Sequence, residues 1–210
     1  MKMVKKLLMA TRNKGKLAEL KKLLDDLPVE ILTLDELPAL TLVEETGSTF
    51  LENAAIKAVA AAKESGLMSL ADDSGLVVDA LDGRPGVYSA RFAGEPADDY
   101  RNNMKLLEML RGIEPAQRTA RFVCAVAIAT PRGQIHTAEG RCEGVILDEC
   151  KGSGGFGYDP LFYVPALQKT FAEMTLEEKS RLSHRGEALR KAALILRRLL
   201  AEGQDDQVPR

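Results

Sequence analysis

Short apolar runs alternate along the chain with longer segments whose apolar residues recur every third or fourth position. Residues 7–10 and 29–34 are runs of the first kind and predict buried strands. Between them, a polar loop leads into an amphipathic helix whose apolar stripe consists of Leu17, Leu20, Leu24 and Leu27. Because strand, glycine-containing loop and helix form half of an α/β unit, the pattern indicates an α/β fold.

The clearest helix signals lie in residues 49–66. Thr49 and Glu52 have the spacing of a capping box, an alanine-rich body follows, and Gly66 supplies a stop. A further helix is predicted over residues 98–111 from the spacing of its apolar residues.

Two long β-prone runs, residues 121–130 and 134–147, are joined by a Pro-Arg-Gly turn. They predict a hairpin, so the sheet is expected to be mixed and not purely parallel. Residues 161–164 predict one more short strand, and the cysteines (Cys124, Cys142 and Cys150) are expected to be small buried hydrophobes.

A second capping box, Thr175 to Glu178, opens the C-terminal helical region. In one continuous helix Lys179 and His184 would point about 140° apart. If both face one ligand, the helix must break near residues 183–186, where Ser183 can cap a new helix.

Two adjacent carboxylates, Asp72 and Asp73, lie between the apolar runs 67–71 and 76–81. With Ser74 and Gly75 they predict a sharp turn between two short strands. Carboxylates are rarely buried unless they are paired or bind a metal. Since Asp-Ser-Gly is also common turn chemistry, the segment alone fits either a tight turn or a metal or acid–base centre.

The polar loop after the first strand combines hydroxyl, amide and cationic groups in Thr11, Arg12, Asn13, Lys14, Gly15 and Lys16. Backbone N–H groups at a helix start attract anions, and lysine adds positive charge. A Walker A loop is absent, so the alternatives are a different kind of phosphate-binding loop and a solvated loop.

A second acidic pair, Glu44 and Glu45, precedes the capped helix. It either favours the helix start or supplies a metal-binding carboxylate from a second segment. A carboxylate ~4 Å from a phosphate oxygen is repelled by about 4 kcal/mol at an effective dielectric constant near 20. If the acidic pairs and a phosphate share one site, a divalent cation such as Mg²⁺ must therefore lie between them.

Residues 154–160, Gly-Gly-Phe-Gly-Tyr-Asp-Pro, have the most unusual composition in the chain. Glycines allow a ligand to approach the backbone, an aromatic ring can stack on a base, and an aspartate can accept from ring N–H groups. The alternative is a glycine-rich turn with Phe156 and Tyr158 in the core. Basic residues near the C-terminus are either a surface face or further ligands of the same molecule.

Composition limits the class of protein. The chain has 210 residues, 45% of them hydrophobic and 29% charged, which predicts one soluble domain over residues 1–210 with a frayed tail at residues 203–210. A net charge of −2 argues against a general nucleic-acid binder. The first apolar run is too short for a signal peptide or a membrane span, so we expect a cytoplasmic protein with no membrane partner.

Taken together, six stretches resemble the inosine triphosphate pyrophosphatase family (XTP/dITP diphosphatases). They follow the family order: residues 10–16, 44–54, 71–76, 86–94, 154–160 and 178–185. The resemblance implies an elongated mixed β-sheet flanked by helices, in two lobes with a central cleft, and a homodimer. It also implies Mg²⁺-dependent hydrolysis of ITP, dITP and XTP to the monophosphate and pyrophosphate.

The resemblance also implies roles for particular residues. Triphosphate contacts fall on Thr11, Asn13, Lys16 and Ser74, assisted by Lys179. Mg²⁺ ligands fall on Glu44 and Asp73, and Asp73 is also the catalytic base or water-orienting residue. Phe156 would stack on the purine, and Asp159, His184 and Arg185 would contact its edge. The substrate-binding loops also include Arg12, Lys14, Gly15, Gly157 and Tyr158, whereas Asp72 is left without an assigned role, as the structural half of the acidic pair.

Three alternatives stay open from the sequence. A noncatalytic purine-nucleotide sensor could use the same loops, although it needs no separated acidic pairs. An RNA-binding module could use the basic C-terminal helix, against the acidic net charge. A pyrophosphatase for other modified nucleotides would share the same site.

Overall fold

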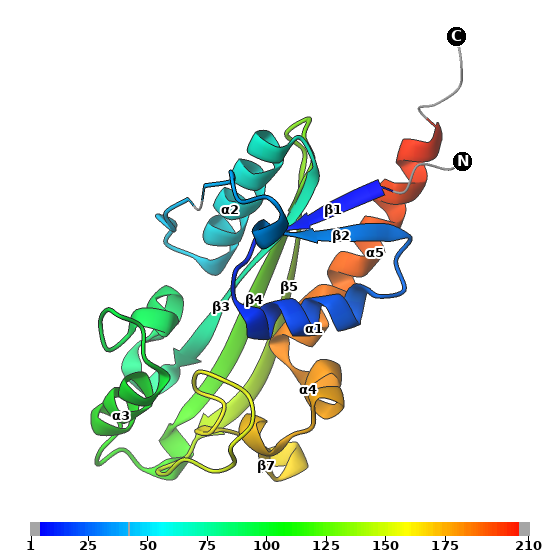
Figure 1. The fold of residues 1–210 in the computed structure, drawn as a ribbon. Helices are drawn as coiled ribbons and strands as arrows, with labels where there is room; N and C mark the ends of the chain where they lie inside the picture. Colours follow the sequence, from blue (N-terminus) through cyan, green and yellow to red (C-terminus); the bar gives the residue numbers. More distant parts are fainter. Residues whose placement is uncertain (1–4, 42, 206–210) are drawn as a thin grey trace. The chain divides into compact units, whose positions relative to one another are not determined.

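The computed structural model describes residues 5–41 and 43–205, apart from the side chains of residues 14, 19, 23 and 202–205. In this part of the chain, the strands form one seven-stranded sheet in the order β2-β1-β3-β4-β5-β6-β7 (Figure 1). The strands are β1 Lys5–Met9, β2 Val29–Thr33, β3 Met68–Val78, β4 Thr119–Ala129, β5 Ile135–Ile146, β6 Phe162–Val164 and β7 Lys169–Thr170. The α-helices are α1 Lys14–Leu24, α2 Phe50–Ser65, α3 Asp99–Met109, α4 Leu176–Leu182 and α5 His184–Asp205. Short 3-10 helices are η1 Leu34–Glu36, η2 Asp79–Leu81, η3 Gly86–Arg91, η4 Pro115–Gln117, η5 Pro165–Leu167 and η6 Phe171–Glu173.

The chain divides into two compact units. Unit 1 comprises residues 1–73, 125–139 and 187–210, and unit 2 comprises residues 74–124 and 140–186. The long strands β3, β4 and β5 contribute residues to both units. The single domain and the central cleft expected from the sequence stay predictions.

Unit 1 is built on parallel strand pairing, with β1 paired to both β2 and β3. Figure 1 shows α2 on one side of these strands and α1 and α5 on the other. Small side chains line the contact of α2 with the sheet: Ala54, Ala58, Ala61 and Ala62 of α2, and Ala125, Ala127 and Ala129 of β4, belong to one buried cluster. Alanines on both elements let the helix backbone pack close to the strands.

Unit 2 has a core of larger side chains and antiparallel pairing of β5 with β6 and of β6 with β7. Three aromatic rings lie at its centre. Phe122 stacks on Phe171, with ring centroids 5.5 Å apart, and makes an edge contact with Phe162 at 4.7 Å. Such pairs stabilise a core beyond the area that they bury.

The mixed α/β class and most of the helices predicted from the sequence are confirmed. Both hydrogen bonds of the Thr49–Glu52 capping box are present, and Gly66 ends α2 in the left-handed conformation at φ 69°. The Thr175–Glu178 capping box is also complete. The helical region does break where predicted: Ser183 separates α4 from α5, and its hydroxyl accepts from the N–H of Gly186.

The turn predicted at residues 72–75 is wrong, because β3 runs without interruption from Met68 to Val78. The sheet order places β3 between β1 and β4, and the pairing with β1 covers Met68–Leu70 of β3. Incorporation into the sheet outweighs the local preference of Asp, Ser and Gly for turns. Consequently Asp72 and Asp73 are strand residues, 1% and 7% exposed.

Smaller corrections concern a cysteine and a strand. Cys150 is exposed, whereas Cys124 and Cys142 are buried as expected. The two-residue strand β7 was not anticipated. Helix α5 continues to Asp205, and residues 206–210 lie outside the described residues, so the frayed tail stays a prediction.

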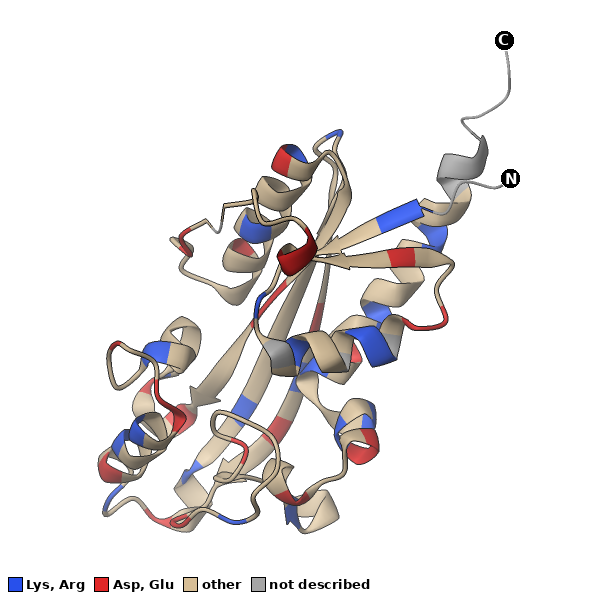
Figure 2. Ribbon diagram, viewed as in Figure 1, with Lys and Arg blue, Asp and Glu red and all other residues tan. Residues whose placement is uncertain are grey.

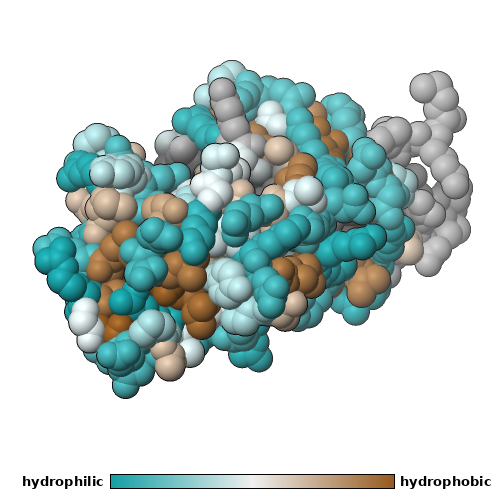
Figure 3. Space-filling view, turned by 90° about the horizontal axis from the view of Figure 1, so that it is seen from below, coloured by the Kyte–Doolittle hydropathy of each residue, from teal (hydrophilic) through white to brown (hydrophobic). Residues whose placement is uncertain are grey.

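Hydrophilic and hydrophobic residues are mixed on the surface. The face in Figure 3 is largely hydrophilic, with hydrophobic residues gathered in separate patches. Among the helices in the described part of the chain, none combines the length and the apolar composition that a membrane span needs.

The alanine contact of unit 1 can be tested by overpacking it. Replacing Ala58, which is 0% exposed, by Leu should lower the free energy of unfolding by about 1–3 kcal/mol, because the facing strand leaves no room for the added carbons. The control Ala18→Leu enlarges an exposed residue of α1 and should have little effect. Denaturant titration measures both, and equal stability of the two variants would contradict close packing of α2.

Candidate active site

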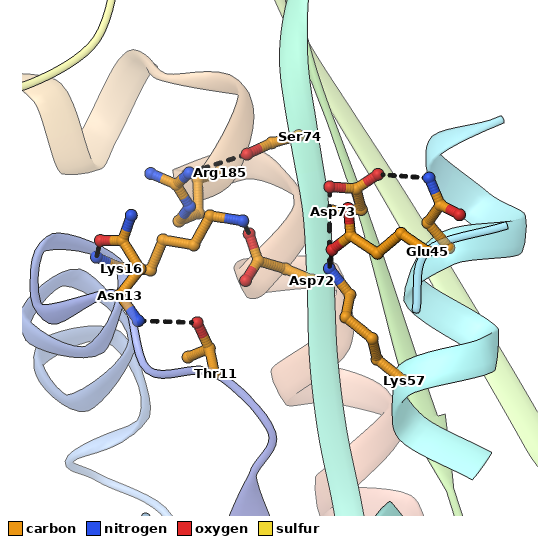
Figure 4. A network of polar contacts seen from close by, with 10 residues as sticks. Thr11, Asn13, Lys16, Glu45, Lys57, Asp72, Asp73, Ser74 and Arg185 are labelled. Atoms are coloured by element: carbon orange, nitrogen blue, oxygen red, sulfur yellow. Dashed lines mark hydrogen bonds and ion pairs between the residues drawn. The ribbon is translucent and has the colours of Figure 1, made fainter. Parts of the chain in front are cut away.

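The loop between β1 and α1 is shaped by its own polar side chains. The N–H of Asn13 donates to the hydroxyl of Thr11 at 3.2 Å, and the side-chain oxygen of Asn13 accepts from the N–H of Lys16 at 3.1 Å (Figure 4). Asn13 is therefore the N-cap of α1. Arg12 is exposed, and the side chain of Lys14 lies outside the described residues.

The first turn of α1 contains no acidic side chain. The positive charge of Lys16 in this turn is instead balanced by a carboxylate of strand β3. Lys16 Nζ lies 2.9 Å from Asp72 Oδ2, and the two side chains are 14% and 0% exposed. A carboxylate with no solvent contact needs such a cation. The structure thus gives Asp72 a partner other than Asp73.

Asp73 points to the opposite side of β3 from Asp72, as consecutive strand residues do. It contacts two residues of α2: Asn53 Nδ2 donates to Asp73 Oδ2 at 3.1 Å, and Lys57 Nζ lies 3.7 Å from Asp73 Oδ1. Lys57 also lies 2.6 Å from Glu45 Oε1. Figure 4 shows the Lys57 ammonium next to both carboxylates.

Burial and charge oppose each other in this cluster. Burial raises the pKa of the Asp73 carboxyl above its ordinary value, the positive charge of Lys57 acts against this shift, and the Glu45 carboxylate adds to it. For Lys57 burial acts to lower the pKa, but the nearby carboxylates, Asp73 foremost, outweigh burial and raise it. The ammonium of Lys57 is therefore firmly protonated.

The two glutamates of the acidic pair before α2 have different surroundings in the structure. Glu45 lies in the ion pair with Lys57, whereas Glu44, the residue named as a metal ligand from the sequence, is exposed. Within the described ranges, no group of three or more His, Cys, Asp or Glu side chains could hold a metal ion. The available donors are the two carboxylates that already share the Lys57 cation.

Asn53 joins this acidic loop to Asp73. Its side-chain oxygen accepts from the N–H of Gly47 at 2.8 Å, while its amide nitrogen donates to Asp73. A Cβ at Gly47 would lie 2.7 Å from the same oxygen, so a larger residue would disturb the contact. Sequence reasoning missed both Asn53 and Lys57. The signal was available, because polar residues four apart share one face of an otherwise alanine-rich helix.

In unit 2, Arg185 connects Ser74 to the glycine-rich loop. Its Nη2 donates to Ser74 Oγ at 2.9 Å, and its Cζ lies 5.6 Å from the centroid of the Phe156 ring. Lys179 Nζ lies 4.8 Å from the same centroid. Arg185 is 2% exposed and Lys179 5%, so both cations are held in buried positions.

The Asp159 carboxylate accepts the hydrogen bonds that order the glycine-rich loop. Its Oδ2 accepts from the N–H of Phe156 at 2.8 Å and from Lys179 Nζ at 2.6 Å. A Cβ at Gly155 would lie 2.0 Å from this oxygen, so the turn requires glycine. The carboxylate therefore fixes the loop and neutralises Lys179 at once.

Two other residues predicted to bind the substrate have core positions. His184 is 4% exposed, and its ring stacks on Phe122 with centroids 4.7 Å apart. Tyr158 is 3% exposed and donates its hydroxyl to the carbonyl of Ser89 at 2.8 Å. The core alternative is thus correct for the Tyr158 ring, whereas Phe156 is half-buried.

Comparison with known proteins gives a consistent result. The model of the Ham1 family matches residues 7–194, which confirms the resemblance inferred from the six sequence stretches. A protein of Desulforamulus reducens named dITP/XTP pyrophosphatase is 61% identical over 92% of this chain and 96% of its own length. One of the same name from Geobacter sulfurreducens is 55% identical over 88% and 92%.

Solved structures agree with these relatives. A HAM1 protein from Coxiella burnetii is 43% identical, with a TM-score of 0.86 over 93% of this chain and 100% of that one. The Ham1 protein of Staphylococcus aureus is 42% identical, with a TM-score of 0.83 over 92% and 98%.

The buried pair of Lys16 and Asp72 yields a stability prediction. Lys16→Met should lower the free energy of unfolding by about 3–5 kcal/mol, because it removes the cation of a fully buried carboxylate. The double variant Lys16→Met/Asp72→Leu should recover most of this loss. Lys191→Met serves as the control, since it breaks an exposed pair with Glu187 and should cost at most about 1 kcal/mol. Equal losses in the two single variants, measured by denaturant titration, would refute the importance of the buried pair.

Proposed function

The chain belongs to the Ham1 family, and we propose that it hydrolyses the non-standard purine nucleoside triphosphates ITP, dITP and XTP to the nucleoside monophosphate and pyrophosphate. The observation that carries this proposal is the cluster in unit 1, where Asp73 and Glu45 gather around Lys57. Carboxylates that orient water, beside cations that bind phosphate, are what phosphoryl transfer requires. The relatives named dITP/XTP pyrophosphatase support the choice of substrate.

We assign the triphosphate to the start of α1. The capped loop directs backbone N–H groups out of the helix end, where they attract anions, and Lys16 adds a positive charge. The proposed phosphate contacts are Thr11, Asn13, Lys16, Ser74 and Lys179.

A divalent cation, Mg²⁺ in our proposal, suits the carboxylates of unit 1. Asp73 and Glu45 already share one cation, the Lys57 ammonium, and carboxylate oxygens completed by water and phosphate are the usual ligands of Mg²⁺. Asp73 would hold the ion together with Glu45 or, as the resemblance implies, Glu44. When bound, the ion would neutralise phosphate charge and polarise the bond to the leaving pyrophosphate.

Asp73 would act on the attacking water. Its carboxylate orients the water and accepts its proton as the new bond to the α-phosphorus forms and the bond to pyrophosphate breaks. Asn53 holds Asp73 Oδ2 at 3.1 Å, so the carboxylate is oriented before substrate arrives.

The base would be bound by residues of unit 2. Phe156 offers an aromatic face for stacking, and Asp159 and Arg185 offer an acceptor and a donor for its edge; His184 belongs to the same proposal. The 6-oxo group of hypoxanthine or xanthine accepts from Arg185. Adenine presents an amino group there and leaves the donor unpaired, which costs about 1–3 kcal/mol. A cytoplasmic location and a homodimer, which the resemblance implies, complete the proposal.

Replacing Asp73 tests the catalytic role. Asp73→Asn keeps the size of the side chain and its bond from Asn53 but cannot take up the proton, so turnover of ITP should fall about 10²-fold or more. Pyrophosphate release measures turnover, and thermal unfolding checks that the fold persists. Near-normal turnover in a folded variant would refute the role of Asp73.

A hydrolysis panel with product identification tests the function itself. ITP, dITP and XTP should yield monophosphate and pyrophosphate, ATP should react far more slowly, and chelation of divalent metal should stop the reaction. A noncatalytic nucleotide sensor would bind ITP without forming IMP.

An RNA-binding module is disfavoured by the pairing of its basic residues. Figure 2 shows acidic and basic residues interspersed along the chain. On α5, Lys191 pairs with Glu187, and Arg197 pairs with Asp26. Paired cations release fewer counterions from a phosphate backbone, so they contribute little to nucleic-acid affinity.

A further inference from the structure

Helix α3 forms hydrogen bonds to the loop of Phe156 at Gly157. The N–H of Gly157 donates to Asp99 Oδ2 at 2.7 Å, and its carbonyl accepts from Asn103 Nδ2 at 3.0 Å. Asp99 and Asn103 are four residues apart and therefore lie on the same face of α3. Both backbone polar groups of Gly157 are thus bonded to one helix.

These bonds fix the backbone on one side of Phe156, and Asp159 fixes it on the other. The N–H of Gly157 belongs to the same peptide group as the carbonyl of Phe156, while the N–H of Phe156 donates to Asp159 Oδ2. Gly157 has a φ of 62°, a conformation that few other residues adopt. The half-buried Phe156 ring therefore projects from a backbone that is held at both neighbouring peptide groups.

Helix α3 is itself firmly anchored. The side-chain oxygen of Asn102 accepts from the N–H of Ala93 at 2.7 Å, and its nitrogen donates to the carbonyl of Ala90 at 2.9 Å. Asn102 is 1% exposed, so this contact is interior. The helix can therefore act as a rigid support for the loop.

The next residue of the loop is fixed as well. The Tyr158 hydroxyl donates to the carbonyl of Ser89. Burial, and after it the negative charge of Asp99, raise the pKa of this hydroxyl well above its ordinary value, so it keeps the proton that it donates.

We propose that Asp99 and Asn103 are positioning residues that place Phe156 for the purine base, and so set the affinity for the nucleoside part of the substrate. This inference rests on the proposed function. Neither residue needs to touch the substrate. Loss of the Asp99 bond would free the N–H of Gly157 and let the Phe156 ring occupy several positions, which weakens stacking. The residues of unit 1 proposed to act on the phosphates are not part of this contact, so the effect should appear in KM and not in kcat.

Asp99 is the better residue to change, because it is exposed and its removal leaves no cavity. Asp99→Ala should raise KM for ITP about tenfold, the effect of one lost hydrogen bond to a charged acceptor, with kcat within about twofold of the wild type. Asp99→Asn keeps an oxygen that accepts from Gly157 and should restore most of the affinity. Glu108→Ala removes another exposed carboxylate from α3 and should change neither constant.

Asn103→Asp provides a second variant, since it replaces the donor to the Gly157 carbonyl by a carboxylate. KM should rise as in Asp99→Ala if the variant stays folded by thermal unfolding; if it unfolds, the Asp99 variants decide. An unchanged KM in Asp99→Ala, a loss of kcat alone, or equal impairment of Asp99→Asn and Asp99→Ala would overturn the inference. A wild-type protein that hydrolyses no purine triphosphate would instead refute the proposed function.

Discussion

A carboxylate on a buried strand is largely removed from water, so it must be matched by a cation or by hydrogen-bond donors. Strand β3 carries two such residues in succession. Because side chains alternate along a strand, Asp72 and Asp73 make their closest contacts on opposite faces of β3. Lys16 from the start of α1 contacts Asp72, and Asn53 with Lys57 from α2 contacts Asp73. The helices of unit 1 are therefore tied to β3 by charge as well as by apolar packing.

This requirement also explains why the cations of unit 1 stand where they do. A lysine in the first turn of a helix is repelled by the positive end of the helix dipole. At Lys16 the compensating negative charge is the Asp72 carboxylate of β3, because the first turn of α1 itself contains no acidic residue. Lys57 is kept charged by the carboxylates around it despite its burial. A group of fixed, desolvated charges lowers the stability of the fold but needs little reorganisation when a charged ligand binds. Such preorganisation is typical of sites that stabilise transferring phosphoryl groups.

Local sequence signals predicted the parts of this structure that depend on near neighbours. Capping boxes at Thr49 and Thr175, the glycine stop at Gly66 and the break at Ser183 involve residues three or four apart, and all are present. The turn predicted at residues 72–75 is wrong because this segment continues β3, whose neighbour β4 in the sheet is distant in sequence. Asn53 and Lys57 were missed because their importance arises only when Asp73 is known to face α2.

The amino-acid composition of the glycine-rich loop predicted some features of its structure and not others. Its unusual residues indicated a ligand-binding segment, and Gly155 does lie so close to Asp159 that no side chain would fit. Composition could not assign directions to its aromatic residues. The Tyr158 ring lies in the core and its hydroxyl donates to the carbonyl of Ser89, while the half-buried Phe156 ring lies near the cations of Lys179 and Arg185. Nor could composition indicate that α3 bonds both backbone polar groups of Gly157.

A loop rich in glycine loses much backbone entropy when it is ordered, so the bonds that hold it must come from residues elsewhere in the fold. The position of an aromatic ring in such a loop is thus a property of its supporting helix as much as of the loop itself.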